Sequence, residues 1–314
     1  MMDEPDEALS LGKVSREILE RSVFPFLPLS AAPELDAGTI LHTGQMAIAH
    51  SPSIGVPVEA LGFFAFHYAA SNVAARFARP KHMVIGLYLP LGSREGDLRT
   101  MAKGLGGEAE KYGVTIVAGQ TATYAGIEIP LLTATCLGEQ LRQPREPAEG
   151  DVIFAVGLVG GEAVWLKSHS EGKRSDVWRG FTPLPAILRL QAAEGVVLMH
   201  DVSEGGVMRA LHEVASTLKL KLEVESGSLH FVEGIEELGE DPLRLPTYGS
   251  LIALVGPDKG GEVQQACGEL GIPCARVGNV EEGEGLYIDG CRVEGLERID
   301  LDKLYGSFNK ADKQ

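Results

Sequence analysis

The chain has 314 residues, of which 44% are hydrophobic and 23% charged, and its formal net charge is −16. This is an ordinary globular composition, with enough residues for two domains that each bury a core. The 44 acidic against 28 basic residues exclude nucleic acid as the main partner, because no cluster of Lys and Arg offers the positive footprint that a polyanion needs. A nucleotide is not excluded, since it needs only local hydrogen-bond donors or a metal ion.

The four cysteines form no CxxC pair and therefore indicate neither a zinc site nor a redox dithiol. Residues 1–8 are acidic and lack the apolar core of a signal peptide, and no apolar run is long enough to span a membrane. We therefore expect reduced thiols in a cytoplasmic protein without a membrane partner.

In the first half of the chain, hydrophobic periodicity predicts alternating helices and strands. The expected helices cover residues 11–29, 61–78 and 97–112, and the expected strands cover residues 39–49, 83–89, 114–118 and 127–137. Pro80 and Gly113 are placed to end the second and third of these helices.

The second half repeats this alternation, which predicts α/β or α+β layers in both halves. Strands are expected at residues 151–156, 195–198, 249–255 and 275–277, a glycine-rich turn at 157–161, and helices from Thr182-Pro183 and over 262–270. Trp165 and Trp178 flank a polar loop, which is either a mobile lid or a solvated excursion. The polar stretch 139–150 is typical of a link between an N-terminal domain, residues 1–138, and a C-terminal domain, residues 151–314.

Residues 199–206, Met-His-Asp-Val-Ser-Glu-Gly-Gly, form a turn between a short apolar strand and an amphipathic helix. Ser203 is predicted to cap the helix, and Gly205 and Gly206 allow a close backbone approach. Free N–H groups at such a helix start suit an anion, and Asp201 beside them suits a cation. The alternative is a capped turn that binds nothing.

His200 is the only histidine for which the pattern suggests a role. It adjoins Asp201, where it would act as a proton donor or as a neutral hydrogen-bonding group. The other histidines show no spacing typical of metal ligands.

Six segments follow one another in the order that one protein family shows. They are Asp36-Ala37-Gly38, Ser71-Asn72-Val73-Ala74, Val117-Ala118-Gly119-Gln120-Thr121, Gly150-Asp151-Val152-Ile153 with the turn at 157–161, residues 199–206, and Tyr248-Gly249-Ser250-Leu251. On these segments the chain resembles the superfamily of aminoimidazole ribonucleotide (AIR) synthase. That superfamily includes thiamine-monophosphate kinase, selenophosphate synthetase and the hydrogenase-maturation factor HypE. The opening Leu11-Gly12-Lys13-Val14 is most similar to the HypE-like, AIR synthase-related branch.

The resemblance implies a two-domain α/β (α+β) chain of the AIR synthase-like fold. It implies that the N-terminal sheet pairs with its twin in a homodimer to form a barrel, that the C-terminal domain is an α/β sandwich, and that magnesium and ATP lie between the domains. The positions that would bind this ligand are Asp36, Asn72, Gly119, Gln120, Thr121, Asp201, Gly205 and Gly206, with Asp36 and Asp201 as metal ligands.

The chain departs from the family where the family has acids. Gly44, Asn72 and Gln120 each replace an acidic residue. Magnesium prefers carboxylate oxygens, and a unit charge at ~4 Å is worth about 4 kcal/mol at an effective dielectric constant of about 20. We therefore expect both ATP and magnesium to be bound weakly. HypE also ends in a reactive cysteine, whereas no cysteine follows Cys291 here, so we do not expect the HypE transfer reaction.

Two functional hypotheses follow. In the first, the protein is a HypE-like, ATP-using enzyme with weakened metal use, which activates an oxygen atom of a small molecule. In the second, it is a catalytically degenerate member that keeps the dimer and serves as a regulatory or assembly protein.

Overall fold

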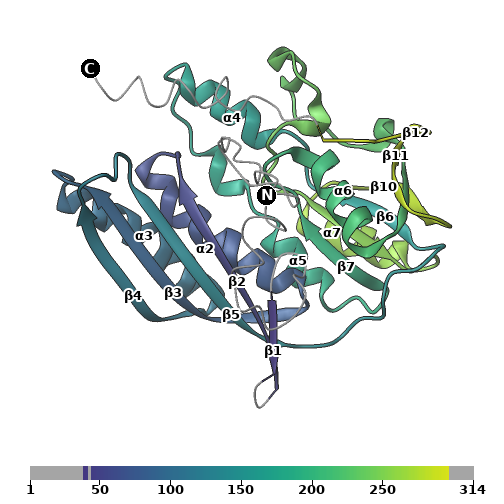
Figure 1. The fold of residues 1–314 in the computed structure, drawn as a ribbon, viewed down its shortest axis with the longest axis horizontal. Helices are drawn as coiled ribbons and strands as arrows, with labels where there is room; N and C mark the ends of the chain where they lie inside the picture. The colour runs from purple at the N-terminus through teal and green to yellow at the C-terminus, as the bar shows by residue number, and fades with distance from the viewer. Residues whose placement is uncertain (1–37, 42–43, 297–314) are drawn as a thin grey trace, which may run out of the picture.

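Two sheets, one from each half of the chain, organise the computed structural model, which describes residues 38–41 and 44–296 (Figure 1). The five-stranded sheet has the order β1-β2-β5-β3-β4, and the seven-stranded sheet has the order β12-β11-β8-β10-β6-β9-β7. Neither sheet closes into a barrel within the chain. The predicted mixed α/β, two-layer architecture is therefore confirmed, while the barrel would require a second copy.

The N-terminal sheet is antiparallel except for its last pair, β3 and β4, which run parallel. Its elements are β1 (Gly38–Leu41), β2 (Gln45–Ile54), α2 (Val58–Ala75), β3 (Ala78–Pro90), α3 (Glu95–Tyr112), β4 (Thr115–Tyr124) and β5 (Leu131–Gln140). Both helices lie on one face of the sheet, and no helix within residues 38–41 and 44–296 covers the other face (Figure 1).

The C-terminal half contains the second sheet, its helices and several 3₁₀ turns. Its elements are β6 (Val152–Val156), α4 (Gly161–Ser170), η2 (Val177–Gly180), α5 (Leu184–Leu190), β7 (Val196–Asp201), α6 (Gly206–Leu218), β8 (Lys221–Val224), η3 (Ser226–Ser228), η4 (Ile235–Leu238), η5 (Pro242–Arg244), β9 (Leu251–Val255), α7 (Gly260–Leu270), β10 (Cys274–Glu281), β11 (Gly285–Ile288) and β12 (Cys291–Arg292). Helices α5 and α7 pack on one face, in the same core as α2, and α6 packs on the other.

Helix α2 is buried on all sides, with 14 buried residues among its 18. It packs against the N-terminal sheet and, in the same core, against Leu184 and Ile187 of α5. Phe63 and Phe64 enter a second cluster with residues of the C-terminal half. Burial extends around the helix because it is enclosed between the two halves of the chain.

Several predicted boundaries were also wrong. The single strand expected at 39–49 is a pair of antiparallel strands, β1 and β2. Helix α2 ends before the predicted residue 78, because Phe77 takes a left-handed backbone conformation with φ 56° and the chain then enters β3. Pro80 therefore lies in a strand and does not end the helix. Gly113 caps α3 in the left-handed conformation, as predicted.

The two tryptophans that flank the polar loop are both buried. Trp165 lies in α4 and Trp178 in η2, each 3% exposed, and both pack with Phe64 of α2. Helix α4 was not predicted, because its short length and its glycines hide the helical pattern. The helix predicted at 11–29 lies outside the described residues. Within the described part of the chain, no helix combines the length and apolar character needed to cross a bilayer.

The segment between the domains is held by Arg142. Its guanidinium donates to the carbonyl oxygens of Gln191, Ala193 and Val196 at 3.0, 2.8 and 2.7 Å. The same group lies over the ring of Phe77, 4.1 Å from its centroid. The link is therefore attached to residues of both halves.

The contact between α2 and α3 gives a test of this packing. A Cβ atom at Gly62 would lie 2.4 Å from the backbone of α3, at the Leu105 nitrogen and the Met101 oxygen. We expect Gly62→Ala to lower the free energy of unfolding by about 1–3 kcal/mol, because overpacking must push two helices apart. Gly107→Ala is the matched control: it meets nothing within 4 Å on the exposed side of α3, and should raise stability by about 0.5–1 kcal/mol. Urea unfolding measures both, and a neutral Gly62→Ala would contradict the described contact.

Candidate functional site

Asn72 and Asp201 bring the two domains together at the candidate site. Asn72 lies on α2, and Asp201 is the last residue of β7, where it is 5% exposed. Because carboxylate oxygens only accept, the amide nitrogen of Asn72 must face them, and it then lies 3.1 and 3.3 Å from the two oxygens of Asp201. Two residues predicted from separate motifs are thus joined by hydrogen bonds.

Tyr248 lies beside this pair and is completely buried. Its hydroxyl is 3.2 Å from the Ser71 hydroxyl, one residue before Asn72. Burial, followed by the negative charge of Asp201, raises the pKa of Tyr248 well above its usual value. The phenol therefore stays neutral and can serve as a hydrogen-bond donor.

Glu162 is a buried carboxyl group in the first turn of α4, on the other side of Tyr248. Its Oε2 accepts a hydrogen bond of 2.8 Å from the Tyr248 backbone N–H. Burial and, to a smaller extent, the nearby charge of Glu204 raise the pKa of Glu162 to about 7, against the lowering effect of the Tyr248 backbone hydrogen bond. Glu162 therefore changes its charge near neutral pH. Nothing in the sequence marks Glu162, since only burial distinguishes it from any other first-turn acid.

The predicted role of His200 is not supported by its position. Neighbouring residues of a strand point to opposite faces, and His200 Nε2 lies 3.2 Å from Glu213 Oε2 on α6. It therefore lies on the α6 side of β7, whereas Asp201 faces α2.

The start of α6 also differs from its prediction. The N-cap is Gly205, at φ 83°, and not Ser203. A Cβ atom at Gly206 would lie 2.4 Å from the Leu243 carbonyl oxygen and 2.6 Å from that of Leu245. Gly206 is therefore required for the packing of the helix start against the protein's own backbone, and this contact explains the glycine without any ligand.

The remaining predicted residues are not brought to this site within one chain. Gly119, Gln120 and Thr121 are exposed on β4, the edge strand, which Figure 1 places at the far side of the N-terminal sheet from β7. Asp36 lies outside the described residues. Within residues 38–41 and 44–296, no three His, Cys, Asp or Glu side chains cluster in a way that could hold a metal ion.

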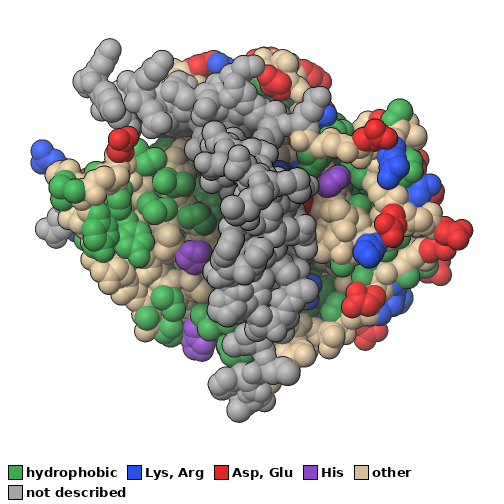
Figure 2. All heavy atoms as spheres, viewed as in Figure 1, with side chains coloured by type: hydrophobic (Ala, Val, Ile, Leu, Met, Phe, Trp, Pro, Cys, Tyr) green, Lys and Arg blue, Asp and Glu red, His purple; other side chains and the backbone are tan. Residues whose placement is uncertain are grey.

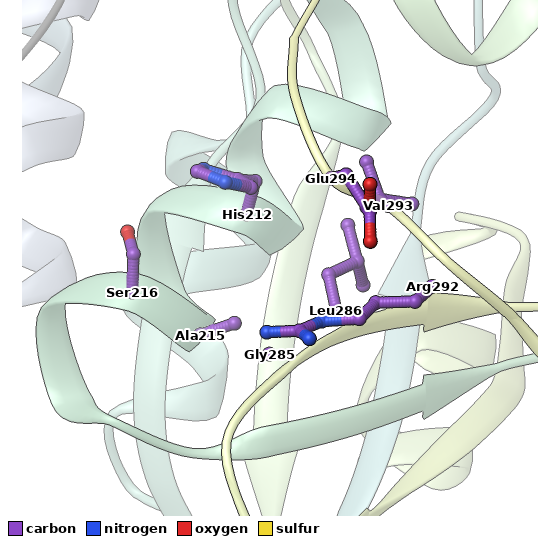
Figure 3. A pocket seen from close by; sticks show the side chains of 8 residues that line it. All are labelled: His212, Ala215, Ser216, Gly285, Leu286, Arg292, Val293 and Glu294. Carbon is purple, nitrogen blue, oxygen red and sulfur yellow. The ribbon is translucent and has the colours of Figure 1, made fainter.

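A separate polar pocket lies between α6 and the β11–β12 hairpin (Figure 3). His212 on α6 and Arg292 and Glu294 near the hairpin are its ionisable lining residues. None of the residues predicted from the sequence lines it.

Comparison with known proteins identifies the family. Residues 35–140 match the N-terminal domain of AIR synthase related proteins, and residues 148–290 match the C-terminal domain. The chain belongs to the AIR synthase-related family. This confirms the resemblance inferred from the six segments.

Within the AIR synthase-related family, the chain is similar to carbamoyl dehydratase HypE of Bradyrhizobium diazoefficiens, with 26% identity over 78% of this chain and 76% of the relative. It is also similar to the thiamine-monophosphate kinase of Pyrococcus horikoshii, with 26% identity over 74% of each chain.

Solved structures of a HypE protein and of a thiamine-monophosphate kinase share the fold. HypE in complex with ATP matches with a TM-score of 0.68 and 20% identity over 92% of this chain and 98% of that one. A thiamine-monophosphate kinase, AaThiL, complexed with AMPPCP and TMP matches with a TM-score of 0.73 and 19% identity, over 91% and 98%. HypE in a HypE–HypF complex matches with a TM-score of 0.68 and 18% identity, over 84% and 92%.

The raised pKa of Glu162 predicts a pH dependence of stability. Because its folded pKa of about 7 exceeds the model-compound value of 4.5, the folded state binds more protons, and the stabilisation is lost as pH rises through 7. Between pH 5 and 9, the free energy of unfolding should fall by about 2–3 kcal/mol relative to Glu162→Gln. Glu149→Gln, at an exposed acid, is the control and should follow the parent protein. Parallel curves for the parent and Glu162→Gln would refute the assignment.

Proposed function

We propose that the protein is a dimeric, nucleotide-binding member of the AIR synthase-related family in which binding depends little on magnesium. The observation that carries this proposal is the hydrogen-bonded contact between Asn72 and Asp201. Two carboxylates at this separation would repel each other unless a cation lay between them. An amide in place of one carboxylate removes the repulsion, so the contact is stable without a cation.

The composition of the site supports this proposal. Magnesium takes near-octahedral oxygen ligands, and the described part of the site offers the carboxylate of Asp201, both of whose oxygens face Asn72. This donor set does not fit a tightly held magnesium ion. The nucleotide itself is proposed by analogy with the relatives, whose structures were determined with ATP or AMPPCP.

The face of the N-terminal sheet opposite α2 and α3 supports a homodimer, since no described helix lies on it. Ile54, Val84 and Tyr124 are 50%, 36% and 47% exposed, on β2, β3 and β4. Figure 2 shows hydrophobic side chains gathered over this sheet. A sheet face of this kind is typical of a surface that another chain covers. Gln120 on β4 is exposed, so a second copy would bring Gly119, Gln120 and Thr121 into an interface.

A second candidate function is that of a regulatory or assembly protein that binds nucleotide without turning it over. The neutral side chain of Asn72 favours this regulatory or assembly role. Phosphoryl chemistry relies on metal ions to neutralise developing charge, and an amide adds no charge that would bind such an ion. The HypE–HypF complex shows a relative with a protein partner. Phosphate release separates the two candidates.

Thermal unfolding with ATP tests the proposed function. At ~100 times its dissociation constant, ATP should stabilise the protein by about 2.7 kcal/mol, and the gain should be similar with magnesium or with EDTA. The absence of a shift in both conditions would refute nucleotide binding. Phosphate release above the buffer rate would favour an enzyme that turns over ATP. Stabilisation by ATP without phosphate release would favour the regulatory protein.

Restoring acids to the site should restore dependence on magnesium. We expect Asn72→Asp combined with Gly44→Asp, the position at which the family resemblance places a further acid, to bind ATP at least tenfold more tightly with magnesium than with EDTA, because added carboxylates create a donor set for the ion. Calorimetry gives both affinities. Asp97→Asn on α3, away from the site, is the control and should keep the parent's metal independence. A double variant that gains nothing would show that the site is misplaced.

A charge on the sheet face opposite α2 and α3 should separate the dimer. Val84→Asp should convert the protein from a dimer to a monomer in light scattering, because an aspartate would be buried against an apolar partner surface. Val177→Asp places the same charge at a residue that is 57% exposed in η2 and should leave the dimer intact. A parent protein that is already monomeric at micromolar concentration would contradict the proposed assembly.

A further inference from the structure

A chain of buried hydrogen bonds runs from the candidate site to the surface of α3. Ser71 Oγ lies 3.2 Å from the Tyr248 hydroxyl, which is also within hydrogen-bonding reach of Thr182. Thr182 Oγ1 lies 2.7 Å from His67 Nδ1, and His67 Nε2 lies 3.0 Å from Glu108 Oε2. We call these five residues the α2 relay.

The chemistry of its members gives the α2 relay a direction. The Glu108 carboxylate only accepts, so Nε2 of a neutral His67 carries the hydrogen and Nδ1 is the acceptor. Thr182 therefore donates to Nδ1, and its oxygen is left to accept from the Tyr248 hydroxyl. Tyr248 then accepts from Ser71. Each hydroxyl has one orientation as long as His67 is neutral.

The α2 relay crosses the boundary between the domains. His67 and Ser71 lie four residues apart on the same side of α2, whereas Thr182 precedes α5 and Tyr248 precedes β9. Ser71 is next to Asn72, and the charge of Asp201 acts on Tyr248. The orientation of Tyr248 is therefore coupled to both partners of the Asn72–Asp201 contact.

The surroundings of His67 keep it neutral at neutral pH. Glu108, Lys111 and Tyr112 face it from α3, and Phe63 packs against it from α2. Burial lowers its pKa and outweighs the opposing effect of Glu108. In acid, a protonated Nδ1 could no longer accept. Thr182 would have to turn its hydrogen away from Nδ1, and the Tyr248 hydroxyl would lose its oriented acceptor.

We propose that His67 is a positioning residue, which acts through Thr182 and Tyr248 to set the Asn72–Asp201 contact and thereby makes the ligand affinity of the site dependent on pH without touching the ligand. The ligand part of this statement rests on the proposed nucleotide function. The coupling between His67 and Tyr248 does not.

A nucleotide-free experiment tests the coupling. In protein labelled with ¹³C at the tyrosine ζ carbon, the Tyr248 resonance, assigned by Tyr248→Phe, should shift with a midpoint below pH 6.5. In His67→Gln, which keeps one donor and one acceptor but does not titrate, this shift should vanish. His230→Gln, at an exposed histidine, should retain it. A Tyr248 resonance in the parent protein that stays constant from pH 8 down to the onset of acid unfolding would overturn the proposal.

The affinity for ATP tests the consequence. Between pH 7.5 and a pH below the midpoint of the Tyr248 shift, the parent should lose roughly threefold to tenfold more affinity than His67→Gln, the equivalent of one hydrogen bond. The comparison between variants removes the titration of ATP itself. Thr182→Val should bind weakly at both pH values, whereas Thr100→Val, at a half-buried threonine on α3 whose hydroxyl donates only within its own helix to the Gly96 carbonyl oxygen, should behave like the parent.

The outcomes are distinguishable from failure of the proposed function. Equal affinities for Thr182→Val and the parent, or equal pH profiles for His67→Gln and the parent, would overturn the positioning role even if ATP binds. A Tyr248 resonance that follows His67 in a protein that binds no ATP would reject the nucleotide function and support the relay.

Discussion

The burial of α2 from every side is the constraint on which the rest of the structure depends. A helix without a solvent face must satisfy each of its polar side chains within the protein, because an unpaired polar group in such a place costs free energy. His67, Ser71 and Asn72 each find partners outside the helix, on α3, before β9 and at the end of β7 respectively. The relative placement of the domains and the chemistry of the candidate site thus have the same origin.

This constraint also explains why the contact at the candidate site needs no ion. Asn72 donates to Asp201 directly, so the amide and the carboxylate satisfy each other. The domains can then remain joined whether or not a ligand is present, which suits either a nucleotide-binding enzyme or a regulatory protein of the AIR synthase-related family.

The elements predicted well from sequence are those whose boundaries are determined by residues close by in the chain. Gly113 ends α3 because a glycine adopts the left-handed backbone conformation of the C-cap without strain. Strands β6 and β9 are continuous apolar runs, which the sequence shows directly. Burial that depends on the other domain could not be predicted. The aromatic face of α2 toward Trp165 and Trp178 and the raised pKa of Glu162 both arise from contacts between distant segments. The six family segments located Asn72 and Asp201, but sequence order could not show that Gly119 to Thr121 lie on a distant edge strand.

Arg142 has a further consequence for how the protein moves. An interdomain segment usually provides the freedom for one domain to rotate against the other, as in enzymes that close around a substrate. Here three carbonyl oxygens of the C-terminal half and an aromatic ring of the N-terminal half hold one guanidinium within that segment. We therefore expect this segment to restrain rotation of the two halves against each other, since such a rotation would break the contacts of Arg142.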